Sequence, residues 1–173
     1  MKNIAVKYGV YALIITVIWT LIEHFLGYNT TNHETGQYAR MIGSFVFWLM
    51  IIFGIAAVRK QQGNVMTFGQ GFKAGSTISV IYALGVSIWY AIYGEVINTQ
   101  YKPTLMAFER SKLDAVHASP DIIAAKMKEV DLSTGGSVIS YVFLFIFMSI
   151  SGIVIAAITS LLLKRKSRVT VDR

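Results

Sequence analysis

Residues 137–163 read SVISYVFLFIFMSISGIVIAAITSLLL and contain no charged side chain. A helix rises about 1.5 Å per residue, so this stretch is long enough to cross a hydrocarbon core about 30 Å thick. A backbone in lipid must satisfy its own hydrogen bonds, and the chain shows no alternating pattern typical of a membrane barrel. The stretch therefore predicts a membrane-spanning helix.

Three more apolar stretches precede it. We expect spans at about residues 4–26, 41–58, 74–94 and 137–163. The opening MKNIAVK resembles the basic start of a cleaved signal peptide, but no A-x-A-like site follows, which favours an uncleaved first helix. With 173 residues, 54% hydrophobic content and a mean hydropathy of +0.55, the chain is predicted to be a single all-α, polytopic membrane domain over residues 1–173.

The charges of the polar segments predict the orientation. Residues 1–7, the inner loop 59–73 and residues 164–173 hold ten basic side chains and one acidic one. The outer loops, 27–40 and 95–136, hold six basic and seven acidic side chains. The positive-inside rule therefore places both termini in the cytoplasm. The pI of about 9.7 follows from this asymmetry, and because no RNA-binding motif accompanies it, we expect no nucleic-acid partner.

The basic segment KRKSR, at residues 164–168, has two interpretations. It is a stop-transfer anchor at the end of the fourth span, or a polybasic patch for anionic lipid or a partner. Both can hold together.

The outer loop 95–136 is the only sizeable segment outside the predicted bilayer. Pro103 suits the first turn of a helix, and Ser119-Pro120-Asp121 is typical of a second helix start. We expect a helical hairpin over the extracytoplasmic surface, which serves as a structured connector or binds a partner.

Small residues recur at four-residue spacing on two spans. The six positions are Gly71, Gly75 and Ser79 near the third span, and Gly152, Ala156 and Ser160 in the fourth. Such stripes let helix backbones approach closely in lipid, so we expect these two spans to pack through them. The alternative is ordinary composition, because glycine is common in membrane helices. Thr67 is the expected N-cap of the third helix.

Polar residues in the first span form one candidate site. Thr16, Thr20 and Glu23 share a helix face, and His24 is adjacent. One interpretation is a polar path that opens to the outer side. The other is an interfacial carboxylate with threonines that bond back to their own helix.

Catalytic chemistry is scarce elsewhere. The second, third and fourth spans carry no Asp, Glu, Lys, Arg or His between their ends, and the chain has no cysteine. These absences argue against a proton relay, a charged pore ring and thiolate chemistry. His33-Glu34 lacks the second histidine of H-E-x-x-H. We therefore expect no enzyme activity, no cofactor, no metal and no catalytic residue.

Three stretches resemble one bacterial membrane-protein family. They are KNIAVKYGVYALI at residues 2–14, VRKQQGNVMTFGQGFKAG at residues 58–75, and Tyr101-Lys102-Pro103. The chain resembles the family called domain of unknown function 4199 over nearly its whole length. The matching positions are a basic residue that closes the second helix and a Thr-Phe-x-x-x-Phe-x-x-Gly start of the third: Arg59, Thr67, Phe68, Phe72 and Gly75.

The resemblance implies four spans, a long outer loop and a bacterial inner membrane, and it supplies no activity and no site residue. We expect a non-catalytic membrane component that acts through helix packing and its outer hairpin. Its partners would be the lipid bilayer and a second copy or another membrane protein. The alternative is a small transporter or channel whose path is lined by Thr16, Thr20 and Glu23.

Overall fold

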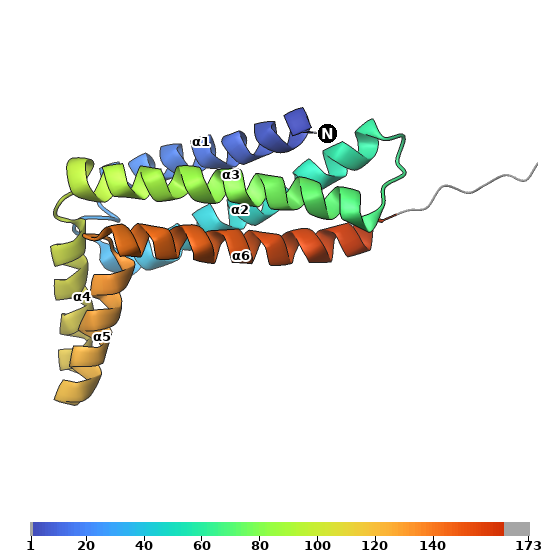
Figure 1. Ribbon diagram of the computed structural model, residues 1–173. Helices are drawn as coiled ribbons and strands as arrows, with labels where there is room; N and C mark the ends of the chain where they lie inside the picture. The colour runs from blue at the N-terminus through green and yellow to red at the C-terminus, as the bar shows by residue number, and fades with distance from the viewer. Residues whose placement is uncertain (1, 165–173) are drawn as a thin grey trace, which may run out of the picture.

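The computed structural model describes residues 2–164, and these residues are helical apart from short connections (Figure 1). The elements in chain order are α1 (Lys2–Phe25), α2 (His33–Gln61), α3 (Phe68–Ile92), the π-helical turn η1 (Tyr93–Ile97), α4 (Tyr101–Ala115), α5 (Pro120–Ser133) and α6 (Val138–Leu163). No strand occurs in the described part of the chain, which confirms the all-α prediction.

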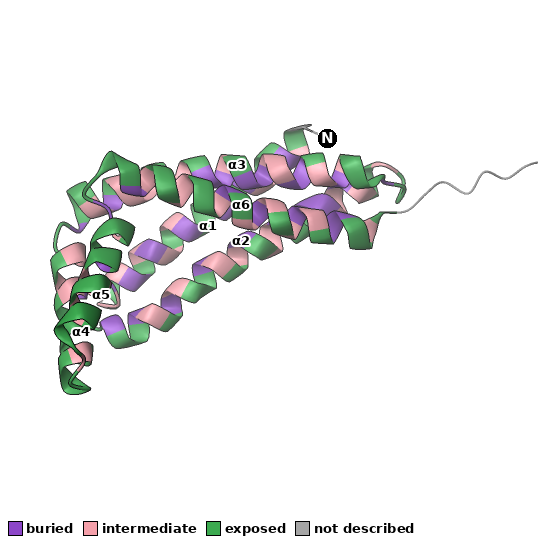
Figure 2. Ribbon diagram, turned by 60° about the horizontal axis from the view of Figure 1, so that its bottom comes forward, coloured by how far each residue is buried: buried purple, intermediate pink, exposed green. Residues whose placement is uncertain are grey.

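Four long helices form a bundle. Helices α1, α2, α3 and α6 lie along one another, with the largest contact between α3 and α6 (Figure 1). The start of α1, the connection between α2 and α3, and the last turn of α6 lie at one end. Helices α4 and α5 pack side by side and run crosswise at the opposite end, which we call the α4–α5 end (Figures 1 and 2).

Large apolar side chains cover the outside of the bundle. Phe143 is 68% exposed, Phe147 is 67% exposed and Leu162 is 77% exposed. All four long helices are long and apolar enough to cross a membrane. A continuous apolar exterior on helices of this length is what lipid, rather than water, would cover. The prediction of a multi-pass membrane protein is confirmed at this level.

The centre of the bundle is filled by one apolar cluster. Phe47 of α2 and Tyr82 of α3 are fully or almost fully buried, and their rings stack with centroids 4.0 Å apart. Ile51, Ile55 and Ile78 continue the same cluster. Buried residues therefore line the inner faces of the four helices (Figure 2).

The helix starts follow local capping chemistry. Thr67 is the N-cap of α3, and its Oγ1 accepts a hydrogen bond from Gln70 N at 3.3 Å while Gln70 Oε1 accepts one from Thr67 N at 2.8 Å. This capping box satisfies two N–H groups of the first turn. Helix α5 begins at Pro120 with Ser119 at the N-cap position; the Ser119 side chain makes no capping hydrogen bond, and the proline at the first helical position favours the start. Both starts are those predicted from the sequence.

The helices extend beyond the apolar runs. Helix α2 begins at His33, inside the expected outer loop 27–40, because Asn32 caps it by accepting a hydrogen bond from Thr35 N at 3.1 Å. Only residues 62–67 connect α2 to α3, whereas the expected inner loop was 59–73. An apolar run measures the hydrocarbon thickness, and a helix continues through the polar turns on either side. Of the basic segment 164–168, all but Lys164 lies outside the described residues.

Candidate functional site

The two small-residue stripes lie against each other in the α3–α6 contact. A Cβ atom placed on Gly71 would lie 2.8 Å from Ser160 Oγ. One placed on Gly75 would overlap Ala156 Cβ, and one placed on Gly152 would overlap Ser79 Oγ. The two helices thus pair antiparallel, and each small residue makes room for its partner.

The polar residues of α1 face the centre of the bundle. Thr16, Thr20 and Glu23 are at most 2% exposed. Thr16 Oγ1 lies 3.2 Å from the Tyr82 hydroxyl, and Thr20 Oγ1 donates to the carbonyl of Thr16 at 2.8 Å. These hydrogen bonds tie the hydroxyl groups to α3 and to their own helix.

Glu23 is the buried carboxylate of the bundle. Its Oε2 accepts a hydrogen bond from Asn29 Nδ2 at 3.3 Å, whereas Oε1 is buried without a partner among the described residues. A buried carboxylate oxygen without a donor costs free energy, so Glu23 is an unusual residue to find inside the bundle.

Asn29 connects this carboxylate to the helices around it. Its Oδ1 accepts from Arg40 Nη1 at 3.4 Å, and its backbone carbonyl accepts from Asn98 Nδ2 at 2.9 Å. Asn29 itself is 2% exposed. Asn29 therefore links α1 and α2 through its side chain, and links both to the segment that follows η1 through its backbone carbonyl.

His24 belongs to the same network. Its Nδ1 lies 3.1 Å from the Tyr93 hydroxyl, which also accepts from Asn98 Nδ2 at 3.0 Å. The network that contains Glu23, His24, Asn29, Arg40 and Asn98 is called the polar cluster below. It lies at the α4–α5 end of the bundle.

Sequence reasoning identified Glu23 and His24 but missed the other members. Asn29 lies in a tight turn that depends on Gly27, which adopts a φ of +76°. The carbonyl of Gly27 accepts a hydrogen bond from Asn32 N at 2.8 Å and closes this turn. Asn98 follows the π-helical turn η1. Neither turn has a sequence signature strong enough to place its side chain. Arg40 did carry a signal, because it is the last charged residue before the apolar run 41–58.

A hollow of about 240 Å³ lies beside the polar cluster. Its lining comes from every helix except α1: Arg40, Ser44, Tyr90, Tyr93, Gly94, Tyr101, Ser133, Thr134, Gly135, Ser140, Tyr141, Leu144 and Met148. We call it the Arg40 hollow. The Arg40 guanidinium lies 6.0 Å from the centre of the Tyr101 ring, within the range of a cation–π contact. Burial raises the pKa of the Tyr101 phenol, so it stays a neutral hydrogen-bonding group.

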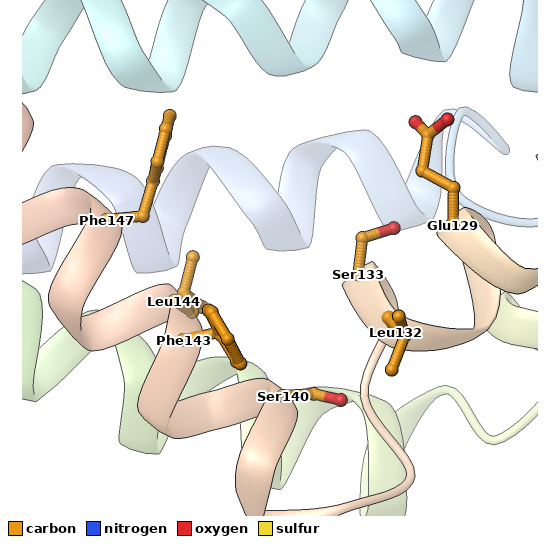
Figure 3. A pocket seen from close by; sticks show the side chains of 7 residues that line it. All are labelled: Glu129, Leu132, Ser133, Ser140, Phe143, Leu144 and Phe147. Atoms are coloured by element: carbon orange, nitrogen blue, oxygen red, sulfur yellow. The ribbon is translucent and has the colours of Figure 1, made fainter.

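The Arg40 hollow adjoins a second one in the angle between α5 and α6. This hollow has a volume of about 390 Å³ and is lined mainly by apolar side chains of α6, among them Phe143 and Phe147, with Glu129 and Leu132 from α5 (Figure 3). The two hollows share Ser133, Ser140 and Leu144.

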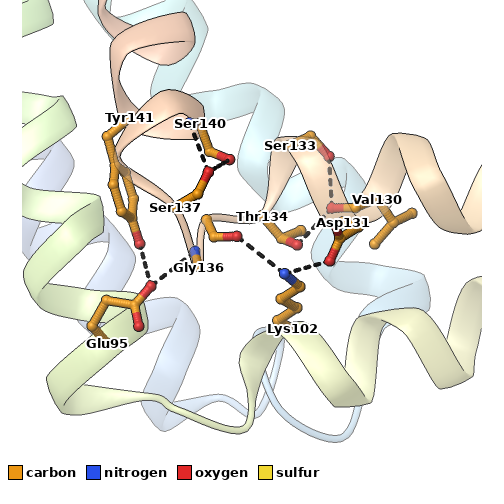
Figure 4. Close-up of polar contacts among 11 residues, drawn as sticks. Glu95, Lys102, Val130, Asp131, Ser133, Thr134, Gly136, Ser137, Ser140 and Tyr141 are labelled. Atoms are coloured by element: carbon orange, nitrogen blue, oxygen red, sulfur yellow. Dashed lines mark hydrogen bonds and ion pairs between the residues drawn. The ribbon is translucent and has the colours of Figure 1, made fainter.

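The base of the α4–α5 pair is fastened to the bundle by polar contacts. Lys102 Nζ lies 2.6 Å from Asp131 Oδ1 and donates to the Gly135 carbonyl at 3.1 Å (Figure 4). Glu95 Oε1 accepts from Gly136 N at 2.9 Å and from the Tyr141 hydroxyl at 2.7 Å. These contacts join the start of α4 to the end of α5, and join η1 to the start of α6 and to the loop between α5 and α6.

His33 adds a contact on the other side of α4, where its Nε2 lies 2.9 Å from Thr104 Oγ1. Within residues 2–164, no three His, Asp or Glu side chains are grouped as metal ligands.

Four apolar helices of membrane-spanning length, closed by a polar cluster at one end, define the class of an integral multi-pass membrane protein. The family model described as "Protein of unknown function (DUF4199)" matches residues 7–165. The chain belongs to this family, as its sequence resemblance indicated. No curated protein and no solved structure matches it.

Proposed function

We propose that the protein is a non-catalytic component of a bacterial inner membrane that acts through its helix packing and through the α4–α5 pair. In this proposal both termini face the cytoplasm, and the α4–α5 pair forms a hairpin on the extracytoplasmic surface. The charge asymmetry of the polar segments supports this orientation.

The observation that carries the proposal is the way the α4–α5 pair is held. Its base is fixed by Lys102 and by the Glu95 contacts, whereas its distal turn exposes apolar residues: Val116 is 71% exposed and Ile122 is 55% exposed. An element that is fastened at its base and carries apolar residues at its far end suits contact with a partner. The partner would be a second copy of the chain or another membrane protein.

The polar residues of α1 favour this proposal over transport. The Thr16 hydroxyl contacts the Tyr82 hydroxyl and the Thr20 hydroxyl donates to the helix backbone, and neither residue lines the Arg40 hollow or the hollow between α5 and α6. A conducting path needs polar groups that face water or substrate. A small transporter or channel stays as the second candidate because Glu23 Oε1 is buried without a partner.

One experiment separates the two candidates. In a strain that lacks the gene, complementation would be compared between a double variant, Thr16→Val with Glu23→Gln, and a chain from which residues 102–130 are deleted. The proposal expects the double variant to complement and the deletion to fail, with both proteins present in the membrane at the level of the parent. The reverse result would support transport and overturn the proposal.

A further inference from the structure

We propose that the Arg40 hollow and the groove that continues from it between α2 and α6 bind an anionic glycerophospholipid of the surrounding membrane. The lipid phosphate would lie at the Arg40 guanidinium, and one acyl chain would lie in the groove. This inference goes beyond the proposed role of the α4–α5 pair and does not depend on it.

The position of Arg40 matches the depth of a lipid phosphate. Residues 41–58 carry no charge, and Arg40 and Arg59 flank them on the same helix. At about 1.5 Å per residue this run extends about 27 Å, close to the hydrocarbon thickness of a bilayer. The two arginines therefore mark the two boundaries between hydrocarbon and headgroups, and the Arg40 hollow opens at one of them.

The groove begins directly below that boundary. It has a volume of about 530 Å³ and lies between α2 and α6, lined by Met41, Ile42, Ser44, Phe45, Trp48, Phe147, Met148 and Ser151. Ser44 and Met148 also line the Arg40 hollow, so the Arg40 hollow and the apolar groove adjoin each other at these two side chains. Met41 and Phe147 are each 67% exposed, which leaves the groove open to lipid along its length.

The charge in the hollow suits a phosphate. Arg40 is the only charged residue among those that line it. Its guanidinium has five N–H donors, of which Nη1 contacts Asn29 Oδ1 at 3.4 Å, and no carboxylate of the described residues lies within 4 Å of it.

The neighbouring charges are already engaged. Lys102 pairs with Asp131, Glu95 accepts from Gly136 and Tyr141, and Glu23 is separated from Arg40 by Asn29. A planar guanidinium with unused donors is the side chain best suited to a phosphate.

A lipid explains both halves of the site. A transmembrane helix of a partner would cover the apolar groove, but it would not by itself bring an anionic group to Arg40. A phospholipid joins an anionic phosphate to an acyl chain, which matches a hollow that holds Arg40 and adjoins an apolar groove. The surrounding bilayer also supplies it at high local concentration.

The fluorescence of Trp48 can report whether a lipid occupies the groove. A protein with Trp19→Phe and Trp89→Phe keeps Trp48 as its single tryptophan, and its indole N–H contacts Ser151 Oγ at 3.1 Å inside the groove. The protein would be reconstituted in phosphatidylcholine vesicles with a rising fraction of phosphatidylglycerol whose acyl chains are brominated, because bromine quenches tryptophan only at contact. The control is a second single-tryptophan protein, in which Phe replaces all three native tryptophans and Val154→Trp places one on an exposed part of α6. We expect Trp48 to reach half-maximal quenching at a fraction of brominated lipid several-fold below the fraction that the control needs.

Three variants test the assignment. Arg40→Gln should raise the half-maximal fraction several-fold to the value of the Val154→Trp protein, whereas Arg59→Gln, which removes the same charge at the opposite boundary, should leave it unchanged. Ser44→Phe fills the junction of hollow and groove without altering Arg40, and should raise the fraction as well. If Arg40→Gln does not fold, as judged by gel filtration and circular dichroism, Ser44→Phe decides.

The alternatives give different results. If Arg40→Gln and Ser44→Phe both give the same quenching curve as the parent, Trp48 senses only ordinary surrounding lipid, and the proposal is overturned. Weak quenching of Trp48 at every lipid composition means that protein covers the groove, which also overturns it. Recovery of fluorescence on addition of glycerol 3-phosphate would indicate a site for a soluble phosphate instead of a lipid.

Discussion

Gly75 of α3 lies directly against Ala156 of α6, so closely that a methyl group on Gly75 would overlap Ala156 Cβ. The same register brings Gly71 to Ser160 and Ser79 to Gly152 on either side. In lipid, helices gain little from burying apolar surface against each other, so close backbone approach supplies much of the attraction between them. The α3–α6 contact is therefore sensitive to the volume of single side chains.

Gly75→Ala should destabilise the protein by about 1–3 kcal/mol, since the added methyl group forces α3 and α6 apart. Thermal unfolding in detergent would measure this. Gly69→Ala is the matched control on the same helix, because nothing lies within 4 Å of the added Cβ and alanine favours the helix. The double variant Gly75→Ala with Ala156→Gly should recover part of the loss. Equal stability of Gly75→Ala and the parent would contradict the packing argument.

The contact between α3 and α6 shows which features of the fold can be predicted from the sequence. Four-residue spacing predicts a stripe on each helix, and the apolar runs predict the helices themselves, because both depend on local periodicity. The antiparallel register of Gly75 on Ala156 is a relation between two helices that no local pattern records. Whether α4 and α5 lie outside the membrane stays a prediction from the distribution of charge.

The polar cluster was harder to predict from the sequence than the helices and the small-residue stripes. Thr16, Thr20 and Glu23 share a face of α1 by spacing alone, but the spacing left open whether that face meets solvent, lipid or protein. The structure buries it. Asn29 and Asn98 come from turns whose geometry depends on Gly27 and on η1, and asparagine in such polar segments is too common to single out.

Asn29→Ala should destabilise the protein by about 1–3 kcal/mol, because it removes the donor to Glu23 Oε2 and leaves that carboxylate buried without a partner. Asn3→Ala, at an exposed position on α1, is the control and should change little. Unfolding by a denaturing detergent, followed by circular dichroism, would compare the two. A cost for Asn29→Ala no larger than for Asn3→Ala would mean that the polar cluster does not hold this end of the bundle together.

Lys102→Met should loosen the α4–α5 pair while leaving the bundle folded. The methionine keeps an apolar stem but loses the contacts to Asp131 and to the Gly135 carbonyl. The chain has no cysteine, so spin labels at Val116→Cys and Val154→Cys report one distance between the distal turn and α6. We expect a broader distance distribution for Lys102→Met.

Two further variants sharpen that measurement. Lys112→Met removes an ion pair that lies within α4, 3.6 Å from Glu109, and should leave the distribution unchanged. Asp131→Asn should broaden the distance distribution only slightly, because Lys102 keeps its hydrogen bond to the Gly135 carbonyl. An exposed ion pair also contributes less than about 1 kcal/mol to stability. A broad distribution already present in the parent would mean that the contacts at the base do not fix the pair.

The proposed orientation predicts that the two ends of the bundle face different compartments. Val65 in the α2–α3 connection is 38% exposed and Val116 in the distal turn of the α4–α5 pair is 71% exposed, so a cysteine at either position can react with a maleimide. In intact bacterial cells whose outer membrane has been permeabilised, a membrane-impermeant maleimide should label Val116→Cys and spare Val65→Cys until the inner membrane is disrupted. The parent chain, which lacks cysteine, gives the background, and Val154→Cys on α6 should stay unlabelled because lipid covers it. The basis is the excess of cations in residues 1–7, 59–73 and 164–173, which resist transfer across the membrane. Labelling of Val65→Cys and Val116→Cys from the same side would remove the four-span topology on which the orientation depends.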